Sequence, residues 1–157
     1  LGLKNKDLFH MALGEEEREI EMEMPIMKGV RMQGLSHVSH KSIEGYEEKG
    51  VKFRVKQRSL DHMKELQELP ISAVKMDVEN YEQFVLKGAI ELFRKHKPIL
   101  YCELWDNENR QQCFKLLQAL EYEIFVLAEQ DLKVFDPASD LQHNFFFIPT
   151  IRKKEFL

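Results

Sequence analysis

The sequence predicts an α/β fold built around a doubly wound parallel sheet. Two apolar runs, residues 72–78 and 99–105, are typical of buried strands. Amphipathic segments at 81–97 and 107–122 follow them, with apolar residues at helical spacing. The order strand, helix, strand, helix, strand indicates βαβ units, whose crossovers are right-handed.

Length and composition set the broad class. A chain of 157 residues accommodates one domain, and 43% apolar with 32% charged residues indicates a globular protein. The net charge of −4 argues against a nucleic-acid binder, which normally has a basic face. No apolar run is long enough to span a bilayer, so we expect no membrane insertion.

The cysteines and the first residue give two further expectations. Cys102 and Cys113 lack CxxC spacing, so we expect no metal site and a reduced, cytoplasmic protein. The chain begins with Leu1 rather than Met, and we expect that further sequence precedes it in the natural protein.

The first half of the chain predicts strands separated by a long loop. Residues 7–13 form a short strand closed by Gly14, and residues 15–25 alternate charged and apolar residues, as a half-exposed strand does. Residues 26–50 contain scattered glycines and predict a long loop insertion within a single domain, 1–157. Alternation resumes at Val51 and predicts another strand.

The remaining elements follow from caps and periodicity. Ser59 or Asp61 is the expected N-cap of a short helix that ends before Pro70. After the two βα units, residues 123–137 predict a strand, a turn and a short strand. Residues 143–149 predict a final aromatic-rich strand.

Acidic residues stand at the ends of both central strands. Asp77 and Glu79 follow the first strand, and Glu103 stands near the end of the second. In such sheets ligands bind in the crevice beyond the carboxyl ends of the strands, so these carboxylates are candidate site residues. An alternative is that Asp77 or Glu79 caps the next helix, and that Glu103 is simply solvated. Trp105 beside it is expected to lie in the core.

The stretch VKMDVENYEQFVLKGAIELFRKHKPILYCEL resembles the carboxyl-terminal half of the FkbM family of S-adenosylmethionine-dependent methyltransferases. The matching positions are Lys75, Asp77, Val78, Glu79, Glu82, Val85, Leu86, Lys87, Gly88, Ala89, Lys97, Pro98 and Glu103. HMALG, RSLDHM, LEYEIFVL and HNFFFIP are similar to other family segments in the same order. The resemblance covers nearly the whole chain.

Three departures from the family pattern stand out. Asn80 and Glu121 occupy positions where the family has glycine, and asparagine tolerates positive φ better than most residues. The glycine-rich cofactor loop that follows the first strand of such enzymes has no counterpart here.

The resemblance implies a partial Rossmann-like class I methyltransferase sheet with flanking helices, missing the first two strands. The family's strand order is 3-2-1-4-5-7-6, so the missing strands would lie between the third and the fourth. The fourth strand would then have an unpaired edge. We expect either that upstream sequence completes the sheet or that the fragment rearranges or self-associates into a homo-oligomer through this edge.

The resemblance also implies roles for particular residues. Asp77 and Glu79 would be catalytic. His37, Glu103 and Asn144 would bind the substrate, although a solvated loop histidine and a strand-end hydrogen bond explain His37 and Asn144 equally simply. The segment His10, Met11, Ala12 and Leu13 falls where the fold places the adenine of S-adenosyl-L-methionine, and ordinary core packing is its alternative.

The implied activity is methyl transfer from S-adenosyl-L-methionine to a hydroxyl on a sugar, another glycan or a small metabolite, and we assign no residue to a metal. A carboxylate would orient or remove the hydroxyl proton. Two alternatives stay open from the sequence. The chain could be a non-catalytic binding or scaffold module without its cofactor half, or a fragment that is inactive without upstream sequence.

Overall fold

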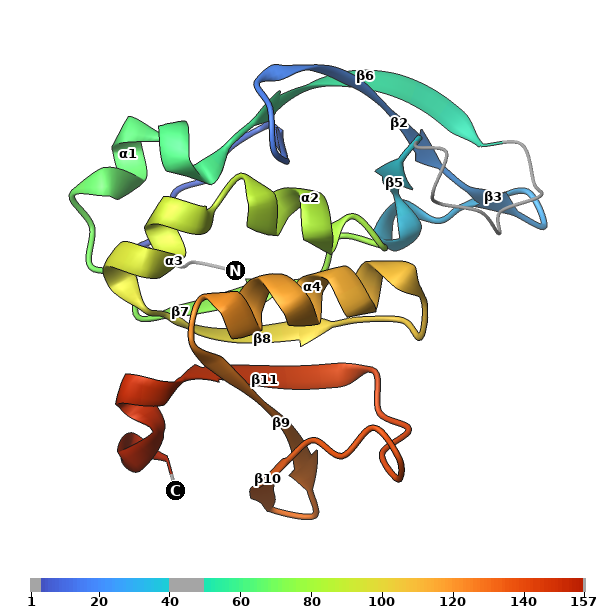
Figure 1. The fold of residues 1–157 in the computed structure, drawn as a ribbon. Helices are drawn as coiled ribbons and strands as arrows, with labels where there is room; N and C mark the ends of the chain where they lie inside the picture. The colour runs from blue at the N-terminus through green and yellow to red at the C-terminus, as the bar shows by residue number, and fades with distance from the viewer. Residues whose placement is uncertain (1–3, 40–49, 157) are drawn as a thin grey trace.

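The computed structural model describes residues 4–39 and 50–156, which form a mixed α/β structure with two main sheets. The helices α2, α3 and α4 lie on the side of the five-stranded sheet that faces strands β2 and β6 of the other sheet (Figure 1). This confirms the mixed α/β class predicted from the alternation of strand and helix patterns.

The five-stranded sheet contains the second half of the chain. Its strand order is β10-β9-β11-β8-β7. The strands are β7 (Ala73–Met76), β8 (Ile99–Glu103), β9 (Tyr122–Ala128), β10 (Asp131–Val134) and β11 (Asn144–Pro149). β7 and β8 are parallel, and β11 lies antiparallel between β8 and β9. Within the described part of the chain, β7 pairs on one side only.

The four-stranded sheet contains most of the first half. Its order is β1-β6-β2-β5, and its strands are β1 (Ala12–Leu13), β2 (Arg18–Met24), β5 (His37–Val38) and β6 (Val51–Arg58). The half-exposed strand expected at 15–25 is confirmed as β2, whose glutamates pair diagonally with Lys52 and Arg54 of β6. The strand expected at 7–13 is reduced to Ala12–Leu13, because the residues before it are exposed and pair with no other strand.

The expected loop at 26–50 holds more structure than its glycines indicate. A small hairpin joins β3 (Ile26–Met27) to β4 (Val30–Arg31) through Lys28 and Gly29, which both have positive φ, as a two-residue type I′ turn requires. A 3₁₀ turn, Gln33–Leu35, then leads into β5. Residues 40–49 of this expected loop lie outside the described residues.

The single helix expected at 81–97 is two helices, α2 (Glu82–Lys87) and α3 (Ile90–His96). The break lies at Gly88, whose carbonyl accepts hydrogen bonds from Ser59 Oγ at 2.8 Å and from the Asp61 amide at 2.9 Å. The backbone of Gly14 also packs against this corner, where a β-carbon on Gly88 would lie 2.1 Å from the Gly14 carbonyl oxygen. Only glycine fits at position 88, and the helix breaks there because the backbone around Gly14 packs against it.

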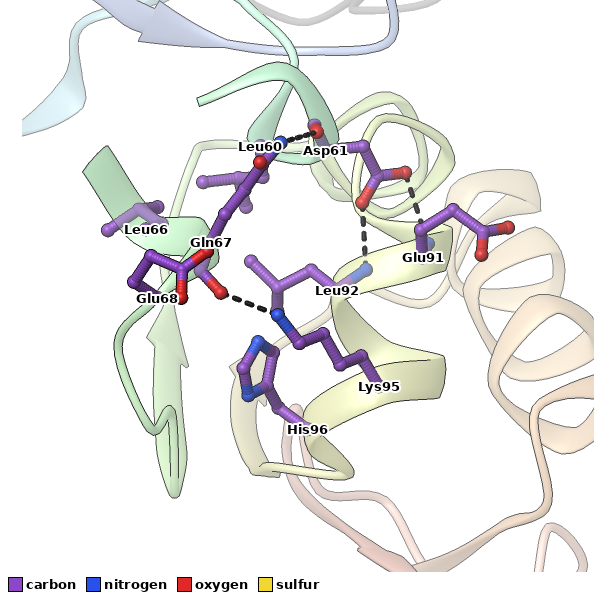
Figure 2. Close-up of a pocket in the computed structure, with 9 residues that line it drawn as sticks. All are labelled: Leu60, Asp61, Leu66, Gln67, Glu68, Glu91, Leu92, Lys95 and His96. Carbon is purple, nitrogen blue, oxygen red and sulfur yellow. Dashed lines mark hydrogen bonds between the residues drawn. The ribbon is translucent and has the colours of Figure 1, made fainter. Parts of the chain in front are cut away.

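Asp61 caps α3 rather than the helix beside it in sequence. Its two carboxylate oxygens accept hydrogen bonds from the amides of Glu91 (3.1 Å) and Leu92 (2.8 Å), as Figure 2 shows. The short helix that follows it, α1 (Lys64–Gln67), has no side-chain cap. Our expectation that Ser59 or Asp61 caps the local helix was therefore wrong, because both bind the α2–α3 junction instead.

The main core lies between α4 (Glu108–Ala119) and the five-stranded sheet. Phe114 of α4 packs edge-to-face on Phe145 and Phe147, with ring centroids 5.2 and 5.9 Å apart. Asn107 caps α4, since its side chain accepts a hydrogen bond from the Arg110 amide. A final 3₁₀ helix, Thr150–Glu155, follows β11.

We predict that Asp61→Ala lowers the free energy of unfolding by about 1–2 kcal/mol, the usual cost of losing a helix cap. Asp61→Asn keeps one acceptor oxygen and should lose less. Glu68→Ala, at an exposed position of the same small cavity, is the matched control and should change stability little. Urea denaturation followed by circular dichroism measures all three, and equal losses for Asp61→Ala and Glu68→Ala would contradict the capping role.

A second prediction concerns Glu121, which has φ +66° where the family has glycine. Removing a β-carbon from the left-handed region relieves about 1 kcal/mol of strain. Its carboxylate also lies 3.1 Å from Lys97 Nζ, but the side chain is 79% exposed, so this ion pair contributes little. Glu121→Gly should raise the melting temperature relative to Glu121→Ala, which loses the same ion pair and keeps the strain. A lower melting temperature for the glycine variant would show that no strain is stored there.

Candidate functional site

Asp77, Glu103 and Asn144 meet at one end of the five-stranded sheet. Met76, the last residue of β7, is in register with Cys102 of β8, so Asp77 follows beside Glu103. Asn144, the first residue of β11, is in direct register with Glu103. We call Asp77, Glu79, Glu103 and Asn144 the strand-end cluster. The structure thus brings three of these sequence-predicted residues together by strand register alone.

Three members of the strand-end cluster, Asp77, Glu103 and Asn144, lie on the sheet face opposite α4. Alternate residues of a strand point to opposite faces, and the α4 side chain of Phe114 contacts Phe145, the register partner of buried Cys102. Tyr101 and Phe146 therefore occupy the other face, with ring centroids 4.8 Å apart. Tyr101 Oη donates a hydrogen bond of 2.9 Å to Asn144 Oδ1, which fixes the amide orientation.

Asp77 is held by a neighbouring cation. Lys75 Nζ donates to Asp77 Oδ2 at 2.8 Å, and both side chains are more than 40% exposed. The hydrogen bond from this ammonium to Asp77 raises the pKa of Lys75. The expected alternative, in which Asp77 caps the following helix, is not what the structure has, because α2 starts at Glu82 without a side-chain cap.

Glu79 stands on a strained turn between β7 and α2. Glu79 and Asn80 have φ of +50° and +68°, both in the left-handed region. Asn80 therefore does adopt the conformation for which the family has glycine, and its Oδ1 accepts a 2.8 Å hydrogen bond from Asn107 of α4. Burial, followed by the charges of Asp77 and Glu103, raises the pKa of Glu79, and His37 opposes this shift.

His37 belongs to the other sheet, as part of β5. Its side chain is buried, and its Nδ1 lies 3.1 Å from the Leu35 carbonyl oxygen. It is thus not the solvated loop histidine that we considered as an alternative. Its charge acts on Glu79, where it opposes the rise in pKa.

Glu82 is the residue whose role we missed. It is only 2% exposed, its Oε1 accepts the Asn80 amide at 3.1 Å, and its Oε2 accepts Asn109 Nδ2 at 2.5 Å. Asn109 Oδ1 in turn accepts the Gln83 amide at 3.1 Å. Glu82 therefore ties the strained turn to α4. The signal in the sequence was a glutamate at the start of an apolar helix pattern, where we saw only a family match.

The segment His10–Leu13 is not part of this cluster. His10 is exposed, and Ala12 and Leu13 form β1 beside β6. The next residue, Gly14, contacts Gly88 at the carboxyl end of α2, whereas Glu79 lies before its amino end. The structure therefore does not bring the expected adenine-binding residues together with Asp77.

Trp105 lies beyond the end of β8 and is 41% exposed, so our expectation of a core position was wrong.

Among the described residues, no group of three or more His, Cys, Asp or Glu side chains is arranged to hold a metal ion. No helix in the described ranges is both long and apolar enough to cross a membrane.

Two cavities lie away from the strand-end cluster. The cavity in Figure 2, about 180 Å³, lies between Leu60 and Leu66 on one side and Leu92 of α3 on the other. A larger cavity, about 750 Å³, lies between α4 and the segment that precedes β11. Neither is lined by Asp77, Glu79, Glu103 or Asn144.

The buried Glu82 predicts a pH dependence of stability. Burial raises its pKa in the folded state, so the unfolded chain loses this proton at a lower pH than the folded chain. The free energy of unfolding should fall as the pH rises from the ordinary glutamate pKa to the raised one. Glu82→Gln cannot titrate, and its stability should fall less over this range than that of the wild type.

Denaturation at a series of pH values between 4 and 8 measures this effect. Glu68→Gln, at an exposed site, is the control and should follow the wild-type curve. The charge of Glu82 is one of the causes that raise the pKa of Glu79, so the difference between the Glu82→Gln and wild-type curves includes this coupling as well as the titration of Glu82 itself. Parallel curves for Glu82→Gln and the wild type would contradict the burial argument.

The comparison with known proteins identifies a family for most of the chain, although the match ends before residues 143–149. A family model described as the methyltransferase FkbM domain matches residues 4–130. No curated protein and no solved structure gives a significant match. Because the matched region covers more than half of the 157 residues, and includes Asp77, Glu79 and Glu103, this chain belongs to the FkbM methyltransferase domain family.

Proposed function

We propose that the protein is an S-adenosyl-L-methionine-dependent O-methyltransferase that acts on a hydroxyl of a sugar or small metabolite, with the strand-end cluster as its acceptor site. The observation that carries the proposal is the meeting of Asp77, Glu103 and Asn144 at adjoining strand ends in a member of a methyltransferase family. In open α/β sheets this edge is the usual place for ligands.

The strand arrangement supports the same proposal. The order β7-β8-β11-β9, with β11 antiparallel to its neighbours, corresponds to the last four strands of the order 3-2-1-4-5-7-6 implied by the family resemblance. In that correspondence β7 is the fourth strand, and its unpaired edge is the one on which the first strand would lie. The cluster then lies beside the expected cofactor crevice of a Rossmann-like sheet.

The composition of the cluster suits both reactants. S-adenosyl-L-methionine supplies an electrophilic methyl group on a positively charged sulfonium, and Asp77, Glu79 and Glu103 give this edge an excess of acidic groups over the single Lys75. Carboxylate and amide oxygens also accept hydrogen bonds from acceptor hydroxyls. The residues present therefore fit the chemistry, although His10, Met11, Ala12 and Leu13 stay a proposal as the adenine contact.

Each cluster residue has a distinct proposed task. Asp77, fixed by Lys75, orients the acceptor hydroxyl and accepts its hydrogen bond. Glu79, with its raised pKa, is the better general base, since a base is most effective when its pKa lies near the working pH. Glu103, Asn144 and His37 bind other parts of the acceptor. Alignment of the oxygen with the methyl group supplies most of the rate.

One observation favours a second candidate. His10–Leu13 lie in the other sheet, at the far end of α2 from Glu79. A non-catalytic binding module that keeps the acceptor side without cofactor binding would be consistent with this placement. Calorimetric titration of the folded chain with S-adenosyl-L-methionine separates the two. Micromolar binding supports the methyltransferase, and no detectable heat favours the binding module.

We predict that Asp77→Asn lowers the rate of methyl transfer by a factor of about 10², the usual cost of misplacing a reacting group, because Asp77 orients the acceptor hydroxyl. The Asp77 side chain is 44% exposed, so we expect this variant to fold. The assay follows the transfer of labelled methyl groups to a panel of sugar and small hydroxyl acceptors, with unchanged cofactor binding by calorimetry as the folding check. Asp131→Asn, at an exposed position of β10, is the matched control, and full activity of Asp77→Asn would remove Asp77 from the mechanism.

A further inference from the structure

The larger cavity has the dimensions of a ligand site. It lies between α4 and the segment 135–143, on the sheet face opposite the strand-end cluster, and measures about 750 Å³. Small-molecule pockets typically measure about 300–1,000 Å³. None of the residues so far assigned a function lines it.

A buried guanidinium forms one side of this cavity. The Arg110 side chain is 6% exposed, and its Nε donates to the Trp105 carbonyl oxygen at 3.0 Å. Nη2 lies 3.5 Å from His143 Nδ1 and 3.4 Å from Asp106, which is itself 79% exposed. Within the described residues, Nη1 has no hydrogen-bond acceptor. Burial lowers the pKa of Arg110, so its neighbours compensate its charge only in part.

The charges in and beside the cavity wall sum to one positive charge in excess, because four cations (Arg110, Lys115, Lys133 and Lys153) accompany three carboxylates (Asp106, Glu123 and Asp140). Asp140 is paired with Lys133, and its second oxygen accepts the Asp136 amide at 2.9 Å. Glu123 is paired with Lys153 at 2.6 Å. Lys115, one and a half turns beyond Arg110 on α4, is exposed and makes no ion pair with any described residue. The electrostatics of the wall therefore favour an anionic group.

Apolar and aromatic side chains form much of the rest of the wall, beside Gln111 and Gln118. Phe114 and Phe135 line the cavity, with ring centroids 5.5 Å apart and ring planes at 66°. Val134 and Leu141 extend the apolar lining at the rim and are 59% and 90% exposed. Exposed aliphatic side chains beside aromatic rings favour a flat apolar body, which would cover them on binding.

We propose that this cavity binds a small molecule with a flat, aromatic or alicyclic body and a single carboxylate, which Arg110 and Lys115 hold while Phe114 and Phe135 contact the body. A carboxylate matches the planar fork of a guanidinium and one further ammonium. The site does not depend on the proposed methyl transfer, because its evidence is binding geometry alone.

The test is a titration of the ¹⁵N-labelled chain followed by NMR. The probes are naphthalene-2-carboxylate, its neutral isostere naphthalene-2-carboxamide, and 2-naphthyl phosphate. We expect the carboxylate to shift amide signals of α4, β10 and residues 135–143, and to bind at least about tenfold more tightly than the carboxamide, as expected for a charge-assisted hydrogen bond in a buried site. Tighter binding of the phosphate would overturn the assignment to carboxylates.

Variants locate the anion. Arg110→Gln should weaken carboxylate binding at least about tenfold and leave carboxamide binding nearly unchanged. Arg110 also packs on Phe145, so Arg110→Gln could fail to fold. Variants at two exposed positions, Lys115 and Leu141, keep the test valid in that case. Lys115→Gln should weaken carboxylate binding, and Leu141→Asp should weaken it more than Leu141→Asn. Lys56→Gln, an exposed lysine on β6 of the other sheet, is the control.

Three results would overturn the proposal. They are equal affinity for the carboxylate and the carboxamide, signal shifts centred on Tyr101 and Phe146 of the opposite sheet face, and no saturable binding of any probe. None of these results bears on binding of S-adenosyl-L-methionine, so failure of this proposal is distinguishable from failure of the proposed methyl transfer.

Discussion

The close contact between Gly14 and Gly88 is the constraint on which the arrangement of the two sheets depends. A β-carbon on Gly88 would lie 2.1 Å from the Gly14 carbonyl oxygen, so this approach requires glycine. The Gly88 carbonyl is at the same time bound by Ser59 and Asp61, which follow β6. One corner therefore joins β1, the end of β6 and the α2–α3 break. Through α2 it also fixes the position of the turn that carries Glu79.

The turn before α2 contains strained backbone and a buried carboxylate, and the surrounding hydrogen bonds offset the free-energy cost of both. Glu79 and Asn80 both occupy the left-handed region, which costs about 1–3 kcal/mol for each such residue. Buried Glu82 adds a desolvation cost. Hydrogen bonds hold the turn from both sides. Asn107 donates to the Asn80 side chain, and the Asn80 amide and Asn109 donate to the Glu82 carboxylate. A strained, hydrogen-bonded turn beside a cluster of carboxylates is the arrangement expected where the local backbone serves a site rather than stability.

Local patterns in the sequence predicted the features that interactions between neighbouring residues determine. Periodicity located β8, β11 and α4, and the order of these elements placed Asp77 and Glu103 at one sheet edge. The positive φ of Asn80 agrees with the turn expected where the resemblance has glycine, and Glu121, whose local turn the sequence left open, also has positive φ. The α2–α3 break was not predictable, because its cause is a segment more than seventy positions away in the chain. The role of Asp61 was misjudged for the same reason, since its cap partners are thirty and thirty-one residues distant.

The candidate site residues also divide into those placed by neighbouring segments and those placed by distant ones. Asp77, Glu103 and Asn144 come together because strand register is encoded by neighbouring segments. The position of His10–Leu13 depends on which sheet β1 joins, and a two-residue strand contains too little pattern to decide that. The burial of Glu82 likewise depends on Asn109, which lies on another helix.

The strand-end cluster and the Arg110 cavity lie on opposite faces of one sheet, yet they meet at a single strand end. His143 and Asn144 are consecutive residues; the first lies beside Arg110 and the second accepts from Tyr101. The His143 carbonyl oxygen also accepts the Leu104 amide at 2.7 Å, which ties this end of β11 to the end of β8. A change at residues 103–105 or 143–144 therefore perturbs both places at once. Asp77 and Lys115 are not part of this junction and lie on different elements, so substitutions there would separate the proposed chemistry at the cluster from the proposed binding in the cavity.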